Sequence, residues 1–190
     1  ALFPSHPYGQ QSVLGTQEHL KNPSITNIKN YHDQWYVPNN IAICVSGDFN
    51  PDEFVAIIEK YFGEWKPNEN LPKLEFPQEK PIESPVSIEV VGQEAPFMYM
   101  AWRLPAANSK DMPALEVLTS ILNNGKTGLI DVNINQAQKV LGAGGGVQTF
   151  ADHSCFLLTG RPKKSQSLEE VKDLLLEQIA KLKNGEFDES

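Results

Sequence analysis

The sequence predicts an α+β fold made of layered α/β units, in which mainly antiparallel sheets carry helices packed on them. Short apolar runs with the character of strands alternate along the chain with longer segments whose apolar residues recur at the helical period. Two strand-like runs, 142–150 and 153–159, are close neighbours in the sequence and are expected to lie in one sheet. Together these patterns indicate strands and helices that share a core.

The first third of the chain is expected to hold two capped helices with a strand between them. Ser24 is suited to cap a helix that ends before Pro38, because proline disfavours helix at the residue preceding it. A second helix is predicted from the cap Asn50, which a proline follows, to a stop at Gly63. The run 41–46 is almost wholly apolar and is interpreted as a buried strand.

The second half of the chain repeats this alternation of strands and helices. Its first elements are expected to be strands at 86–91 and 97–104, then helices at 114–122 and 129–138. The last helix is predicted to begin at a capping box formed by Ser167 and Glu170 and to end at Gly185.

A weak internal repeat links the two halves. Residues 43–47, followed by the helix at Asn50, resemble residues 156–160, followed by the helix at Ser167. Each part is predicted to be a strand, a glycine turn and a capped amphipathic helix. Chance similarity remains an open alternative for a match of this length.

Residues 66–85 differ in composition from the rest of the chain. Prolines recur there among lysines and glutamates, a composition that favours an extended, semi-rigid connection over a packed element. We therefore predict a first domain at 1–66, a linker at 67–85 and a second domain at 86–190.

Composition and charge limit the partners. The formal net charge of −8 argues against nucleic acid, whose phosphates require clustered lysines and arginines. No apolar run reaches the roughly 18–20 residues that are needed to span a bilayer. Both ends of the sequence have the character of cut ends, so we expect a piece of a longer protein.

No residue of the chain is predicted to be catalytic or to bind a metal. Helical zinc sites gather histidines three or four residues apart, and none of the histidines has such a neighbour: His6, His19, His32 and His153. Cys44 and Cys155 lie in apolar runs and are interpreted as separate buried thiols, with one disulfide as the alternative.

The glycine-rich run at 142–146 is the sharpest local feature. A glycine-rich loop cradles phosphate when it follows a strand and opens a helix, whereas this run follows a predicted helix and opens a strand. We interpret it as a turn or bulge in which glycine permits unusual backbone angles, with a nucleotide site as the less favoured alternative.

A series of motifs near the start of the chain carries a family resemblance. In chain order they are Phe3-Pro4, His6-Pro7-Tyr8-Gly9, Leu14-Gly15-Thr16, Tyr36-Val37-Pro38-Asn39-Asn40 and Gly47-Asp48-Phe49. With the helical stretch 51–65, they resemble the pitrilysin/insulinase-type zinc metallopeptidases, and the resemblance extends over the whole chain. It implies that 1–66 correspond to the closing part of that family's zinc-bearing first domain, and 86–190 to its non-catalytic second domain.

The resemblance also implies what the chain contributes to a parent protein. The family binds zinc through an inverted His-x-x-Glu-His helix and a later glutamate, all upstream of the matched block. No cofactor is therefore expected in this chain, and zinc is expected in the full-length parent if that motif is intact. In a zinc-dependent endopeptidase this chain would supply scaffold, chamber wall and a peptide anchor, and would be inactive alone. The family suggests a bacterial periplasm or cell envelope.

The implied peptide anchor has two parts. The turn 123–129 resembles a family turn between two helices, and 140–150 resembles the strand that follows. In some members the backbone of these segments binds the amino-terminal end of the substrate peptide. The implied substrate-binding residues are Gly125, Gly144, Gly145, Gly146 and Val147. Expected partners are a peptide and the remainder of the parent protease or a partner subunit. A purely structural homologue and a self-standing peptide-binding module remain as alternatives.

Overall fold

The structure, a computed structural model, describes residues 1–187 and divides into two compact units. Apart from Leu2, the first unit extends to Glu83 and the second begins at Ser84. Within residues 1–187 no helix is both long and apolar enough to cross a membrane.

The first unit is built from helices joined by extended segments. These are α1 (Pro7–Gln10), α2 (Gln17–Lys21), α3 (Ile25–Trp35), the 3-10 helix η1 (Pro38–Asn40) and α4 (Pro51–Phe62). The predicted caps are confirmed, since Ser24 Oγ accepts a hydrogen bond from the Asn27 N–H and Asn50 Oδ1 accepts one from the Asp52 N–H. The two longest helices of this unit thus begin where their sequences predict.

The buried strand predicted at 41–46 is wrong. Those residues have no regular secondary structure, and Ile43 is 49% exposed. A strand requires a neighbouring backbone for its N–H and C=O groups, and none of the described residues pairs with this run. Cys44, which lies in this run, is an exposed free thiol rather than the predicted buried one.

Two further predictions in the second unit need correction. The run 86–91 pairs with no strand among the described residues, and Ile88 is 67% exposed. The helix predicted at 129–138 is helical in its middle, but the segment η2 (Asp131–Gln136) is a π-helix. Turns of π-helix are rare in proteins overall, and those that do occur are often found at functional sites.

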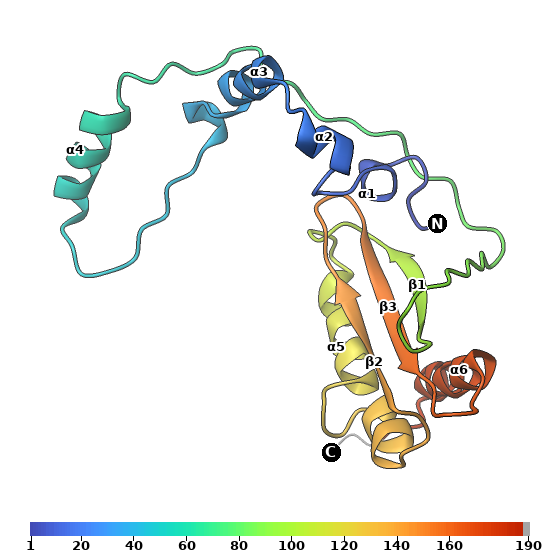
Figure 1. The fold of residues 1–190 in the computed structure, drawn as a ribbon. Coiled ribbons are helices and arrows are strands. Elements are labelled where there is room, and N and C mark those ends of the chain that lie inside the picture. Colours follow the sequence, from blue (N-terminus) through green and yellow to red (C-terminus); the bar gives the residue numbers. More distant parts are fainter. Residues whose placement is uncertain (188–190) are drawn as a thin grey trace. The chain divides into compact units, whose positions relative to one another are not determined.

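The second unit is a three-stranded antiparallel sheet with helices against it (Figure 1). Its elements are β1 (Met98–Leu104), α5 (Met112–Leu122), η2, β2 (Gly142–Gln148), β3 (Ser154–Arg161) and α6 (Leu168–Asn184). The strand order is β1-β3-β2, so β3 is central and β1 and β2 are both edges. The predicted pairing of the last two strands in one sheet is confirmed, as is the α+β class.

Helix α6 begins and ends as its sequence predicts. Ser167 and Glu170 form a reciprocal capping box in which each side chain accepts the other residue's backbone N–H. Gly185 stops the helix with φ of 72°, a left-handed conformation that glycine adopts without steric cost.

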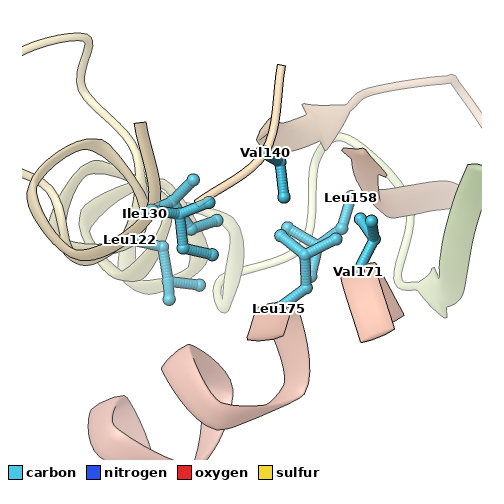
Figure 2. Packing of buried hydrophobic residues seen from close by; sticks show 7 residues of the cluster. Leu122, Ile130, Val140, Leu158, Val171 and Leu175 are labelled. Carbon is cyan, nitrogen blue, oxygen red and sulfur yellow. The ribbon is translucent and has the colours of Figure 1, made fainter. Parts of the chain in front are cut away.

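The core of the second unit lies between the central strand and the helices. Leu158 projects from β3 toward Val171 and Leu175 of α6, while Val140 and the end of α5 close the other side (Figure 2). The buried cluster comprises Leu122, Ile130, Ile134, Val140, Leu158, Val171 and Leu175. Because α5, η2 and α6 all contribute, this core fixes the helical segments relative to the sheet, and so places the residues around β2.

Candidate functional site

The outer edge of β2 is the candidate site, and its backbone groups point in alternating directions. In an antiparallel ladder, successive residues direct both N–H and C=O first toward one neighbour and then away from it. On β2 the residues whose groups point away from β3 include Ala143 and Gly145, because both bond to side chains beyond the edge. The same alternation directs the groups of Val147 outward.

Asn135 occupies the first part of this edge. Its Nδ2 donates to the Ala143 carbonyl at 2.8 Å, and its Oδ1 accepts from the Ala143 N–H at 2.9 Å. The side-chain amide thus takes both outward groups of Ala143, as a neighbouring strand residue would. Asn135 comes from η2, whose contact with β2 brings it there.

Asn123 occupies the next position along the edge. Its Oδ1 accepts from the Gly145 N–H at 2.9 Å, which joins the residue after α5 to the middle of β2. Of the two outward backbone groups of Gly145, Asn123 bonds the N–H but not the carbonyl.

The buried carboxylate of Asp131 holds Asn123 and the turn that follows it. Asp131 is 5% exposed and accepts from Asn123 Nδ2 at 2.6 Å and from the N–H groups of Asn124 and Gly125, each at 2.8 Å. Hydrogen bonds to a carboxylate are charge-assisted and therefore strong, and Asp131 accepts these three. The turn and the strand are therefore connected by one chain of hydrogen bonds, from Asp131 through Asn123 to Gly145.

Beyond Gly145 the edge is open. Among residues 1–187, no donor bonds the Gly145 carbonyl on this side, and neither outward group of Val147 has a hydrogen-bond partner. Val147 is only partly buried, so these groups are not sealed in the core. The site is therefore a short row of three backbone groups: the Gly145 carbonyl as an acceptor, the Val147 N–H as a donor and the Val147 carbonyl as a second acceptor.

The glycine run forms regular strand, which corrects the predicted turn or bulge. Residues 142–148 pair with β3 in unbroken register, and none of these glycines has a left-handed φ. Close packing accounts for Gly145, where a Cβ would lie 2.3 Å from Leu158 Cδ2 and 2.6 Å from the Leu157 carbonyl oxygen. At Gly146, by contrast, a Cβ would be 3.6 Å from Thr119 Cγ2, an ordinary contact.

The predicted site residues thus fall into two groups. Gly144, Gly145, Gly146 and Val147 lie together on β2. Gly125 lies in the turn, with φ of 81° and its N–H on Asp131, so its position serves the turn's conformation. The structure brings the two segments together through Asn123 rather than through Gly125 itself.

No other group of the described residues offers acid–base or metal chemistry at this edge. Within residues 1–187, no three His, Cys, Asp or Glu side chains gather in a metal-binding arrangement. Cys155 is buried in β3, and burial raises the pKa of its thiol, which disfavours the reactive thiolate. What the edge can do chemically is donate and accept backbone hydrogen bonds.

Sequence reasoning missed Asn123, Asp131 and Asn135. A signal for them was present, because short amide and carboxylate side chains commonly bond to nearby backbone. The sequence pattern did not reveal that two asparagines, 12 residues apart in the numbering, would bond to alternate residues of one strand.

The fold and the edge define an α+β domain whose sheet has one partly open strand edge. The sequence of residues 24–190 matches the family described as the peptidase M16 inactive domain. The chain belongs to this family, which confirms the resemblance to the pitrilysin/insulinase type.

Similar proteins agree with this assignment. The chain is 24% identical over 192 residues to zinc protease PqqE of Helicobacter pylori, covering 97% of this chain and 42% of that protein. It is 35% identical over 63 residues to an uncharacterised zinc protease of Mycobacterium leprae, covering 33% of this chain and 14% of that protein. The crystal structure of a protease from Helicobacter pylori superposes with a TM-score of 0.77 at 22% identity, covering 93% of this chain and 43% of that one.

These matches relate the chain to one part of longer relatives. It spans about two fifths of the length of the Helicobacter relatives it matches. Its matched family is the inactive domain, so the chain is a non-catalytic portion of a zinc-protease-type protein.

Proposed function

We propose that this chain anchors peptide substrates in a zinc-dependent endopeptidase, by adding an extended peptide as a further strand on the open edge of β2. The observation that carries the proposal is the row formed by the Gly145 carbonyl and the N–H and carbonyl of Val147. Strand addition of this kind uses main-chain hydrogen bonds for affinity, so it accepts many sequences.

The geometry of an added strand follows from the row. In a parallel peptide, one residue would donate its N–H to the Gly145 carbonyl and accept from the Val147 N–H. The residue two positions later would then donate to the Val147 carbonyl. The family resemblance favours this arrangement, because it places the peptide's amino-terminal end near Gly145.

Zinc would be held elsewhere in the parent protein. The histidines and acidic residues in the described part of this chain form no cluster that fits the ion. The parent would bring the zinc and the residues that activate water, whereas this chain would provide scaffold, chamber wall and peptide anchor. The rest of the parent, or a partner subunit, is therefore its expected partner.

The test compares two substitutions at one edge position. Extended peptides labelled at the carboxyl end would be titrated with the 190-residue chain and followed by fluorescence anisotropy. Val147→Pro removes the outward N–H and should weaken binding about 3- to 10-fold, since one hydrogen bond contributes roughly 0.5–1.5 kcal/mol. Val147→Ala keeps the N–H and is the matched control, with an expected change below about twofold.

A second proline variant controls for a general effect of proline on edge strands. On β1, Tyr99 is aligned with Thr159 of β3, whose backbone groups face β2, so the Tyr99 N–H points away from β3; the Tyr99 side chain is exposed. Tyr99→Pro should leave peptide affinity unchanged. If the unsubstituted chain binds no peptide, or if both prolines weaken binding equally, the anchor proposal is wrong and a purely structural domain is favoured. Zinc-supplemented chain should hydrolyse none of these peptides.

A further inference from the structure

We infer that Asn123, held in position by Asp131, is the residue that fixes where a bound peptide strand must end. This inference rests on the proposed peptide anchor at β2 and adds a specificity determinant to it. It concerns the register and the free end of the bound chain.

The two backbone groups of Gly145 are treated differently. Its carbonyl is open, while its N–H is already bonded to Asn123 Oδ1 at 2.9 Å. At the next outward residue, Ala143, both groups are bonded to Asn135. A ladder that starts at Val147 can therefore continue to the Gly145 carbonyl and no further.

This asymmetry requires a chain end at Gly145. In a parallel strand, the residue two positions before the one at Gly145 would need the Gly145 N–H for its carbonyl. Asn123 Oδ1 already holds that N–H, and it is itself an acceptor, so two oxygens would face one donor. A peptide whose first residue lies at Gly145 avoids this conflict, whereas a longer one meets it.

Asp131 orients the Asn123 amide and so determines which of its atoms faces the Gly145 N–H, where the bound strand must end. Because Asn123 Nδ2 donates to the Asp131 carboxylate at 2.6 Å, the opposite atom, Oδ1, faces Gly145. A carboxylate only accepts, so the reverse orientation would bring two acceptors together. Asp131 is thus a positioning residue that acts through Asn123.

The first test measures the affinity penalty for lengthening a peptide. For the unsubstituted chain, two extra amino-terminal residues should weaken binding about 10-fold, because their carbonyl would face Asn123 Oδ1 and relieving this conflict costs about one to two hydrogen bonds. In Asn123→Ala the Gly145 N–H is free, and the penalty should fall to about twofold. Asn133→Ala is the matched control, since that amide bonds Gln178 and not β2, and it should retain the penalty.

The second test needs no peptide, and its first comparison is made within the unsubstituted chain. In amide hydrogen exchange the Gly145 N–H should exchange at least about 10-fold more slowly than the Val147 N–H. Asn123→Ala and Asp131→Ala should each remove that difference. Equal exchange of the two amides in the unsubstituted chain would overturn the inference, and so would an extension penalty that Asn123→Ala leaves unchanged.

The two proposals fail in different ways. If no peptide binds, the anchor function is lost, and the exchange rates of Gly145 and Val147 still decide whether Asn123 closes the edge. If peptides bind but longer ones bind equally well, the anchor remains and the stop at Gly145 is wrong. A penalty for carboxyl-terminal extension instead would keep the stop and reverse the strand direction to antiparallel.

Discussion

Two regions of the chain with the same sequence pattern have different structures. Residues 41–62 and residues 154–184 each read as a strand, a glycine turn and a capped amphipathic helix. In the second region β3 and α6 form, and Leu175 is fully buried between them and their neighbours. In the first region α4 forms, but 41–46 is not a strand, and Ile57 of α4 is 50% exposed.

The difference shows that nearby sequence can specify a helix, whereas it cannot by itself specify a strand. Each helix has its own capping side chain, Asn50 or Ser167, and its own i to i+4 hydrogen bonds, so a helix can begin from nearby sequence alone. A strand is satisfied only by neighbours, and β3 has one on each side. The run 41–46 has none among the described residues, although its composition is as apolar as that of β3.

The two cysteines offer the largest expected contrast between these regions. Cys44 lies in 41–46 and is exposed, whereas Cys155 lies in β3 and is buried. With iodoacetamide near neutral pH, Cys44 should react roughly a thousandfold faster than Cys155, because reaching Cys155 requires opening a unit of about 5 kcal/mol stability or more. Peptide mapping of the alkylated chain by mass spectrometry measures both rates.

The pH dependence of the alkylation rates tests whether burial is the cause of the slow reaction of Cys155. Burial raises the pKa of the Cys155 thiol above its ordinary value. The thiol is neutral in both folded and unfolded chain below its unfolded pKa, so stability is unaffected there. As pH rises through the raised folded pKa, the unfolded chain ionises first, and folded stability falls. Comparable rates for the two thiols below that range would show that β3 is not protected.

Core truncation is expected to have the next largest effect. Leu175→Ala removes a side chain with no exposed surface from the α6 face and should cost about 2–5 kcal/mol of unfolding free energy. Ile57→Ala, at the corresponding apolar stripe of α4, should change it by less than about 0.5 kcal/mol. Urea unfolding followed by far-UV circular dichroism measures both variants, and equal losses would mean that the α4 face is also packed.

Local sequence predicted most of the second unit. The boundaries of α6 follow from Ser167, Glu170 and Gly185, whose hydrogen bonds and backbone angles depend on adjacent residues only. The strands at 97–104 and 153–159 were also predictable, because each alternates or concentrates residues that suit a half-buried sheet. The run 86–91 has equally suitable residues and forms no strand, since pairing depends on distant backbone that periodicity does not describe.

The candidate site was predictable only in part. The glycines of β2 were identified by composition and by the family resemblance. Their role was not, because Gly145 is required by the Leu158 side chain that crosses from β3. The closure of the edge by Asn123 and Asn135 depends on tertiary contacts that a single sequence does not specify.

Removal of the helix caps should give the smallest effect and the most direct comparison of the two regions. Ser167→Ala breaks the capping box of α6 and should cost about 1 kcal/mol, because this helix is part of the packed core of its unit. Asn50→Ala removes the matching cap of α4, yet a 12-residue helix with a largely exposed apolar face adds little to cooperative unfolding. Its expected effect is a loss of local helicity, with the unfolding midpoint unchanged. Residue-resolved hydrogen exchange separates the two cases. If Asn50→Ala shifts the midpoint as far as Ser167→Ala does, α4 contributes to a cooperative core, and the contrast drawn between the two regions is wrong.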